Sequence, residues 1–304
     1  MSVLLETNLP LPLFRRGKVR DVYDLGDKLL IVSTDRISAF DVVLPCGIPD
    51  KGKVLNQLSA FWFKKTVHIL PNHLIKVIDS NVVLNEVKNL SSQPGELPDS
   101  LVGRSMLVAK GERIPVECVV RGYLSGSAWA EYKETGKVSG ISLPQGMEES
   151  QELSQPIFTP TTKSDTEHDR PLTNQDIKGL DIEDIFKELE QKSLGIYSYA
   201  RDYAKRRGII IADTKFEFGF INGQLALIDE LLTPDSSRFW DASQYEVGHS
   251  QPSFDKQPVR DWLVDSGWDR KPPAPMLPPE VIERTSKRYR EVYSKLTGGV
   301  LKEK

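Results

Sequence analysis

The sequence predicts an α+β fold, with an N-terminal lobe of antiparallel sheet and a larger α/β lobe that ends in a helix. Three observations support this class. Short β-rich runs joined by tight turns come first, helical segments follow near residue 180, and another hairpin comes after them. Strands and helices do not alternate regularly, as they would in a doubly wound parallel sheet.

The bulk composition excludes several functional classes. The chain has 304 residues, a formal net charge of −3 and two cysteines that form no CxxC pair. We expect no nucleic-acid partner, because a polyanion requires a strongly basic surface. Two lone thiols and no apolar run of roughly 18 residues favour a cytoplasmic protein with no membrane partner.

The first lobe is expected to begin with a hairpin. Two β-rich runs, Val19 to Leu25 and Lys28 to Ser33, are joined around Gly26-Asp27, which is a typical turn sequence. Three further elements are expected in this part of the chain: a helix over Val54 to Thr66 and strands over Met106 to Ala109 and Ile114 to Arg121.

The middle of the chain changes character. Ser150 to Pro171 is polar, interrupted by prolines and without periodicity, which predicts a long functional or disordered loop. Asp181 to Arg207 is then expected to form one or two helices, and Gly208 stands where a helix C-terminus prefers glycine.

The last part of the chain predicts a hairpin and a closing helix. Ile209 to Phe220 and Leu225 to Leu231 flank Asn222-Gly223, the strongest short turn signal in the sequence. A proline-rich connector over Lys271 to Pro279 leads to an amphipathic helix over Glu280 to Leu296.

One segment nearly matches a phosphate-binding P-loop. Gly47 to Val54 has the glycines and the lysine, but Val54 stands where the pattern needs a hydroxyl for magnesium. We therefore interpret it as a turn before a helix. The chain has no GxGxxG, HRD or DFG motif, and its four histidines show no metal-ligand spacing.

Ionisable residues gather on one face of the expected 209–220 strand. Side chains alternate along a strand, so Asp213, Lys215 and Glu217 share a face, and Phe216 and Phe218 point into a core. A solvated sheet face explains this pattern equally well. The partner strand ends in Asp229-Glu230, which favours a functional site.

The register of this hairpin bears on metal binding. A strict two-residue turn pairs Asp229 with Phe216, whereas a one-residue bulge places Asp229 opposite Glu217. Opposed carboxylates repel unless a cation lies between them. We therefore predict a bulged turn and a magnesium ion bridging Glu217 and Asp229, with Glu230 as the substitute ligand if the turn is tight.

Two other strand segments carry charges of less certain meaning. Lys18 and Arg20 share a face after Gly17, and they are either a phosphate clamp or solvated cations. Glu117 and Arg121 share a face before a turn rich in hydroxyls. This arginine either binds an anion or pairs with the glutamate.

Two segments near the end of the chain complete the candidate set. Thr233 to Asp241 offers two serine hydroxyls and Arg238, which suits a phosphomonoester, although an ordinary Pro-Asp turn has the same letters. Phe254 to Asp261 is expected to begin a helix, with Asp255 or a neighbour as its cap.

Seven segments, taken together, resemble the succinocarboxamide synthase family. They are GKVRDVYD, STDRISAFD, IPVECVVRGYLSGSAW, PTTKSDTEHD, IADTKFEFG, IDELLTPDSSRFWD and FDKQPVRDWL, and they run in one order from Gly17 to Leu263. The length and the proline-linked C-terminal helix are similar to those of the larger, fungal-type members.

The resemblance implies an activity and a lobe organisation. The N-terminal lobe, residues 1–112, would resemble the small lobe of kinases and ATP-grasp enzymes. Residues 113–268 would bind ATP, Mg²⁺ and a ribonucleotide, and residues 269–304 would pack on that lobe. The reaction would be an ATP-dependent ligation of carboxyaminoimidazole ribonucleotide (CAIR) and L-aspartate, giving the succinocarboxamide product (SAICAR), ADP and phosphate in purine biosynthesis. A monomer or small homo-oligomer is expected.

The resemblance also implies residue roles. ATP would be covered by Gly17, Lys18, Val19 and Arg20, with its adenine at the edge formed by Val108 and Ala109. Lys215 would meet the phosphates and act in catalysis with Asp213, and Glu217 and Asp229 would bind the metal. The ribonucleotide would be held by Arg121, Ser127, Asp213, Ser237 and Arg238. Lys163, Asp169 and the Asp35 to Asp41 loop would border the site, close to L-aspartate.

Two other functions remain possible from the sequence. A small-molecule kinase would share the ATP site and release a stable phosphorylated product. A non-catalytic nucleotide sensor would bind ATP without aspartate-dependent turnover. Whether ADP release requires aspartate distinguishes both from a ligase.

Overall fold

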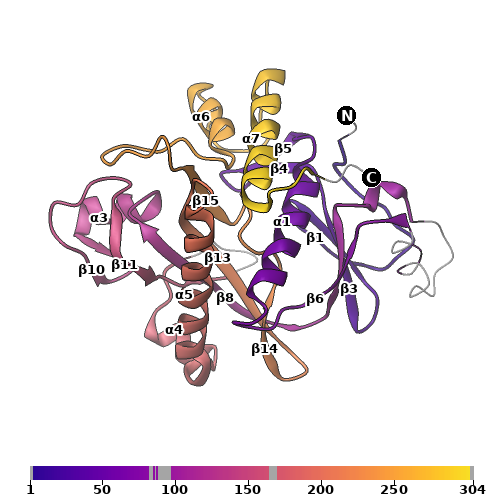
Figure 1. The fold of residues 1–304 in the computed structure, drawn as a ribbon, viewed down its shortest axis with the longest axis horizontal. Coiled ribbons are helices and arrows are strands. Elements are labelled where there is room, and N and C mark those ends of the chain that lie inside the picture. The colour runs from indigo at the N-terminus through magenta and orange to yellow at the C-terminus, as the bar shows by residue number, and fades with distance from the viewer. Residues whose placement is uncertain (1–2, 82–84, 86, 88–96, 164–169, 302–304) are drawn as a thin grey trace.

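The computed structural model describes residues 3–81, 85, 87, 97–163 and 170–301. Its first sheet is antiparallel and belongs to the early part of the chain (Figure 1). In spatial order its strands are β1 (Leu13–Arg16), β2 (Arg20–Asp24), β3 (Lys28–Ser33), β7 (Ser105–Ala109) and β6 (Leu74–Ile78).

The second sheet is also antiparallel and forms the centre of the molecule. Its strands run in the order β11 (Glu152–Phe158), β8 (Glu112–Tyr123), β13 (Ile209–Ile221) and β14 (Gln224–Ile228), with β12 (Thr161–Thr162) on β8 and β15 (Ser237–Asp241) on β13. Two small ribbons complete the strands: β4 (Arg36–Ala39) with β5 (Val42–Gly47), and β9 (Lys137–Val138) with β10 (Ile141–Ser142).

The helices cover these sheets. They are α1 (Lys51–Thr66), α3 (Ser127–Thr135), α4 (Asn174–Gly179), α5 (Glu183–Lys205), α6 (Gln257–Asp265) and α7 (Pro279–Thr297), with a short 3₁₀ turn at Asp99–Leu101. Helix α5 packs on β13 and β8, and α1 packs between β3 and α7 (Figure 1). Of the described helices, none combines the length and apolar character needed to cross a membrane.

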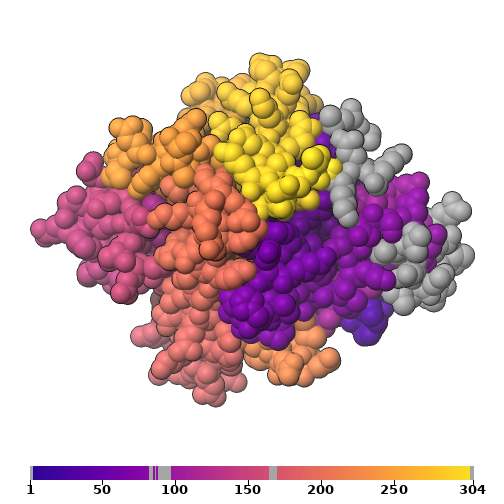
Figure 2. Space-filling view, in the orientation of Figure 1, coloured from indigo at the N-terminus to yellow at the C-terminus, as the bar shows by residue number. Residues whose placement is uncertain are grey.

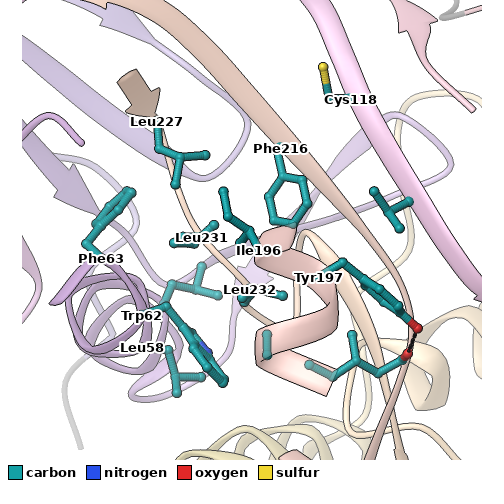
Figure 3. Packing of buried hydrophobic residues seen from close by; sticks show 14 of the residues in the cluster. Leu58, Trp62, Phe63, Cys118, Ile196, Tyr197, Phe216, Leu227, Leu231 and Leu232 are labelled. Carbon is teal, nitrogen blue, oxygen red and sulfur yellow. Dashed lines mark hydrogen bonds between the residues drawn. The ribbon is translucent and has the colours of Figure 1, made fainter. Parts of the chain in front are cut away.

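One hydrophobic core connects the two sheets. Trp62 and Phe63 of α1 lie in the same cluster as Phe216 of β13 and Leu227 of β14 (Figure 3). Tyr197 of α5 enters this core and donates a hydrogen bond of 2.7 Å to the carbonyl of Ile211, so its buried hydroxyl is satisfied. The sheet that carries the candidate site is therefore held rigidly from behind.

The C-terminal helix joins the two parts of the chain. Ser286 of α7 donates to the carbonyl of Pro49 at 2.8 Å, and Tyr289 donates to the carboxylate of Asp235 at 2.8 Å. Figure 2 shows this segment, in yellow, lying against the purple surface of the early chain. Helix α7 thus fixes the turn before β15 relative to the start of α1.

Most of the expected elements are confirmed. The 19–33 and 209–231 hairpins form, and the closing helix spans α7. The near P-loop is a turn that leads into α1, which begins three residues earlier than predicted, at Lys51. The region from 181 to 207 contains one long helix, α5, and Gly208 beyond its end has a φ of 70°.

The prediction of one long loop from Ser150 to Pro171 was wrong over two stretches. Strands β11 and β12 both pair with β8 within it. The register of β11 shifts between Glu152 and Ile157, so Pro156 lies at an irregularity where its missing N–H is tolerated. Residues 164–169 lie outside the described residues. The predicted turn over Thr233 to Asp241 ends early, because β15 occupies its second half.

Candidate functional site

The 209–228 hairpin has a tight turn. Ile221 pairs with Gln224 and Glu217 pairs with Ile228, so two residues form the loop and no bulge separates it from β14. Asn222 and Gly223 have φ values of 50° and 77°, as a type I′ turn requires. The prediction of a bulged turn is therefore wrong, because Asn-Gly alone satisfies the twist of the two strands.

Asp229 nevertheless faces the same cavity as Glu217. It follows the last residue of β14 and has a φ of 68°, a left-handed conformation that aspartate tolerates better than most residues. This local turn redirects a side chain that regular alternation would have pointed away. Its carboxylate lies 2.6 Å from the guanidinium of Arg20.

A polar cavity of about 600 Å³ lies in front of these strands. Its wall includes Ser38 to Asp41 from the first lobe, part of the Asp35 to Asp41 loop that the sequence predicted at its border. Six lining residues are acids: Asp41, Glu117, Glu217, Asp229, Glu230 and Asp235. Six are cations: Arg20, Lys163, Lys215, Arg238, Lys256 and Arg260. A wall with both acidic and basic side chains suits a ligand that contains phosphate groups and a bound cation.

Glu217 and Glu117 face each other across the β8–β13 ladder. The ammonium of Lys163 lies between them, 2.6 Å from Glu217 and 2.8 Å from Glu117. Lys215 holds the other oxygen of Glu117 at 2.5 Å. Glu117 therefore pairs with two lysines, and the alternative pairing with Arg121 does not occur.

Negative charge is incompletely neutralised near Glu217. Burial, followed by the charge of Asp229, raises the pKa of Glu217 to about 7. Burial acts in the same direction on Asp229, yet the charges of Arg20 and Lys163 hold the pKa of Asp229 below its usual range. The corner formed by these two carboxylates would accept a further cation.

The donor set fits a metal that arrives with a ligand. Within the described chain, no group of three or more His, Cys, Asp or Glu residues is arranged to hold a metal ion by itself. Mg²⁺ commonly takes one or two carboxylates and completes its shell with phosphate oxygens and water. Glu230, the substitute ligand, already accepts a hydrogen bond of 2.7 Å from Thr233.

Two arginines meet at Asp213, and of these two Arg238 lines the cavity. Arg238 forms an ion pair with Asp213, and Arg121 lies 3.5 Å from the same carboxylate. Arg121 also donates to the hydroxyls of Thr159 at 3.0 Å and Ser127 at 3.4 Å.

The start of α3 adjoins these arginines. Gly126 precedes the helix with a φ of 57°, and a Cβ there would overlap the guanidinium of Arg238. Because the side-chain oxygen of Ser125 is buried without a hydrogen-bond partner, a further polar group can be accepted here. A helix N-terminus between two guanidinium groups is suited to a phosphate.

Some predicted site residues lie elsewhere. The hydroxyl of Ser237 meets that of Thr214 at 2.8 Å inside the protein, and Ser236 lines the cavity in its place. Val108 is fully buried in a strand paired on both sides, and the amide of Ala109 donates to the carbonyl of His73. Asp169 lies outside the described residues.

The Gly17 turn adjoins the cavity without lining it. The amide of Gly17 donates to the carbonyl of Arg20 at 2.8 Å, and Val19 accepts from Thr34. Lys18 is about half exposed and pairs with Asp41 at 2.6 Å. Of this turn, only Arg20 belongs to the cavity wall, among the residues that the structure describes.

Sequence reasoning missed three contributors. Lys256 and Arg260, at the start of α6, both line the cavity, as does Asp235. The two cations are four residues apart, the spacing that places side chains on one helix face, and this signal could have been used. Asp235 pairs with Lys51 from the other end of the chain, which no local pattern predicts.

Comparisons with known proteins point to one family. A family model described as SAICAR synthetase matches residues 13–275. The chain is 51% identical over 300 residues to phosphoribosylaminoimidazole-succinocarboxamide synthase of Thermodesulfovibrio yellowstonii, covering 97% of this chain and 99% of the relative. The relative of that name from Geotalea uraniireducens is also 51% identical, with 98% of each chain covered.

Solved structures give the same result. A SAICAR synthase from Saccharomyces cerevisiae, complexed with SAICAR, superposes with a TM-score of 0.85 at 42% identity, covering 99% of this chain and 98% of that one. A SAICAR synthetase in complex with ADP has a TM-score of 0.67 at 27% identity, with 94% and 98% covered.

Proposed function

The chain belongs to the SAICAR synthetase family, and we propose that the cavity lined by Glu217 and Arg238 is where its reactants meet. The chain catalyses the ATP-dependent ligation of CAIR and L-aspartate in purine biosynthesis. The main supporting observation is that the acidic corner and Arg238 face one cavity, with Arg121 beside Arg238 on the same carboxylate of Asp213. A nucleotide–metal complex and a phosphate ester can therefore bind within reach of each other.

The chemistry requires an activated carboxylate. A carboxylate does not condense with an amine in neutral water, because its oxygen is a poor leaving group. Transfer of the terminal phosphoryl group of ATP to that oxygen gives an acyl phosphate and ADP. The amine of aspartate then attacks the carbonyl carbon, phosphate leaves and an amide forms.

ATP is assigned to the side of the cavity that faces the first lobe. Arg20 and Lys215 line the cavity and would provide positive charge toward its phosphates, and the adjoining Gly17 to Val19 turn would cover them. The adenine is assigned, on the family resemblance, to the end of β7 at Ala109, where the chain passes into the second sheet; Val108 is fully buried and would act only by fixing the position of that strand. Lys215 would act in catalysis by stabilising charge on the transferred phosphoryl group.

Glu217 and Asp229 would hold Mg²⁺, which supplies charge neutralisation for the phosphates when it is bound. Their unequal pKa values support this assignment, since the carboxylate of Glu217 is short of positive charge. Arg20 orients Asp229, and Lys163 orients Glu217, each through an ion pair.

The ribonucleotide is assigned to the opposite end of the cavity. Its 5′-phosphate fits the start of α3, with Arg238 and Arg121 as counter-ions and Ser127 as a hydroxyl donor. Asp213 holds both guanidinium groups in place and would exchange part of that contact for the ligand. Because the hydroxyl of Ser237 bonds that of Thr214 inside the protein, Ser237 would affect the ribonucleotide only by fixing the position of β15.

L-Aspartate is assigned to the remaining cations. Lys163, Lys256 and Arg260 line the same cavity and suit its two carboxylates, and Asp169 follows in the same motif as Lys163. Three anionic reactants repel one another by several kcal/mol at close range, so this concentration of lysine and arginine is necessary. Positioning of the reactants dominates the rate, with no covalent enzyme nucleophile.

Two further assignments follow from the fold. We place lobe boundaries at residues 1–112, 113–268 and 269–304, which is supported by the passage from β7 to β8 near residue 112. A cytoplasmic location is supported by Cys46 and Cys118, which are both buried free thiols.

The experiment that tests the ligase assignment measures ADP release with each substrate omitted. The proposal predicts release that requires CAIR and aspartate together, and transfer of ¹⁸O from the CAIR carboxylate to phosphate. Stoichiometric ADP release with CAIR alone, leaving a stable phosphorylated product, would instead identify a kinase.

A further inference from the structure

Lys163 occupies the space between two carboxylates that face each other across the central sheet. Glu117 and Glu217 are direct partners in the β8–β13 register. Two carboxylates at such a position repel each other strongly unless a cation lies between them. The ammonium of Lys163 is that cation, 2.8 Å from one and 2.6 Å from the other.

The other acids of the cavity have different partners. Asp229 pairs with Arg20 at 2.6 Å, and the second oxygen of Glu117 pairs with Lys215 at 2.5 Å. Within the described parts of the chain, Lys163 is the cation found within ion-pair distance of Glu217. Removing its ammonium would therefore leave Glu217 exposed to the field of Asp229.

The backbone of Lys163 is fixed although its side chain can move. Its amide donates to the carbonyl of Pro115 at 3.1 Å, and the preceding strand β12 pairs with β8 at Glu117 and Val116. A lysine ammonium is a compact charge on a flexible four-carbon stem. The charge can therefore leave Glu217 by side-chain rotation, without displacing the sheet.

We propose that Lys163 is a positioning residue that acts as an internal counter-ion, competing with the divalent cation for Glu217 until a nucleotide brings that cation into the cavity. This inference rests on the proposed role of Glu217 and Asp229 as metal ligands. Two positive charges cannot share one carboxylate at close range without a large electrostatic cost. Binding of the metal therefore releases the ammonium toward the anionic reactants.

The competition has a consequence for the order of events. A free metal ion must displace the ammonium of Lys163 from Glu217, so its net gain in binding free energy is small. A metal ion bound to a triphosphate brings an anion with which the released ammonium can pair. The enzyme without nucleotide should thus bind divalent cations weakly. An ordinary phosphate-binding lysine would have no such effect on metal affinity in the absence of nucleotide.

The test measures Mn²⁺ binding to the full-length protein without nucleotide, by electron paramagnetic resonance of the free ion. Lys163→Met should tighten Mn²⁺ binding by about tenfold, because one competing positive charge is removed next to the ligand. Lys163→Arg retains the charge and should keep the wild-type affinity. Lys215→Met is the matched control, since it removes an equal charge from Glu117 without contacting Glu217, and its effect should be much smaller.

The outcomes separate this inference from the metal assignment itself. If Lys163→Met weakens Mn²⁺ binding or leaves it unchanged while Glu217→Gln abolishes it, the counter-ion inference is wrong and the metal site stands. If Glu217→Gln has no effect on Mn²⁺ binding with or without nucleotide, the metal assignment fails first. Lys163→Gln serves as a second neutral variant, and circular dichroism confirms that each protein is folded.

Discussion

The carboxylate of Asp229 and the guanidinium of Arg20 lie 2.6 Å apart, although 209 positions separate them in the chain. Arg20 belongs to the first sheet, and Asp229 follows the last strand of the hairpin in the second sheet. This ion pair therefore closes the contact between the two sheets at the candidate metal position. The predictions below depend on the cavity that it borders.

Loss of either Lys215 or Glu217 should abolish turnover while the protein stays folded. Lys215→Met removes charge stabilisation of the transferred phosphoryl group, and Glu217→Gln removes a proposed metal ligand. Each should reduce kcat by at least about 10²- to 10³-fold. Steady-state ADP release measures the loss.

A remote lysine provides the control for that comparison. Lys295 of α7 pairs with Asp241 at 2.9 Å and is not among the described residues that line the cavity, so Lys295→Met should retain normal kcat. Near-normal turnover in Lys215→Met or Glu217→Gln would count heavily against the assigned roles.

Arg238 should control affinity for the ribonucleotide. Arg238→Ala removes charged hydrogen bonds to a phosphate, and the KM for CAIR should rise about 10- to 100-fold. The KM for ATP should change by less than about twofold, since no phosphate of ATP is assigned to this end. A change confined to ATP would refute the placement.

Two glycines at the ends of α3 refine this test. A Cβ at Gly126 would overlap the guanidinium of Arg238, whereas a Cβ at Gly136 would meet nothing. Both have positive φ values, but Gly136 (ψ 10°) is in the left-handed helical region, whereas Gly126 (ψ −128°) is in a region that residues other than glycine rarely adopt, so the backbone strain is larger in Gly126→Ala. Only Gly126→Ala should raise the KM for CAIR, and urea unfolding of both variants separates displacement of the arginine from a general loss of stability caused by backbone strain.

Metal binding should strengthen as the pH rises toward 7. The pKa of Glu217 is raised to about 7, so at pH 6 most molecules carry a neutral carboxylic acid that a metal must deprotonate. The Mn²⁺ affinity should increase about tenfold per pH unit below 7 and level off above it. Titration between pH 5.5 and 8.5 measures this.

The raised pKa of Glu217 has the opposite effect on the stability of the metal-free protein, which should fall as the pH rises. A carboxyl whose pKa is raised on folding contributes stability that is present below its unfolded pKa, near 4.5, and is lost as the pH rises to about 7. Glu217→Gln should remove both dependences. A metal affinity that is constant between pH 6 and 7.5 would contradict the raised pKa.

Lys51 should be essential for stability rather than for chemistry. Its side chain is fully buried and pairs with Asp235 at 2.6 Å. Lys51→Met would leave that carboxylate without its closest counter-ion, which costs about 3–5 kcal/mol for a buried pair. Urea unfolding measures the loss, and Asp235→Asn added to Lys51→Met should restore part of it. A loss below about 1 kcal/mol would show that the charge of Lys256 and the hydrogen bond from Tyr289 are enough to stabilise Asp235.

The sequence predicts the site less completely than the fold. The Asn222-Gly223 turn and the alternation of Lys215 and Glu217 with aromatic residues follow from local physical rules, and both are confirmed. The left-handed conformation of Asp229 does not follow from them, because no glycine marks it. The predicted bulge was therefore wrong, although Glu217 and Asp229 do line the same cavity.

Contacts between distant segments were also beyond local reasoning. The sharing of Glu117 by Lys163 and Lys215 depends on three strands coming together, and the Lys51–Asp235 pair depends on how α1 meets the turn before β15. Strand β11 was missed because its proline and polar residues resemble a loop until β8 is beside them. Tertiary structure supplies what these short patterns lack.

The most direct test is a crystal structure with a non-hydrolysable ATP analogue, Mn²⁺ and CAIR, in which anomalous scattering locates the metal. We expect the Mn²⁺ peak within about 2.2 Å of oxygens of both Glu217 and Asp229 and of the triphosphate, with the CAIR phosphate at Arg238 in the same cavity. A metal bound away from these two carboxylates, or CAIR in a separate cavity, would contradict the account.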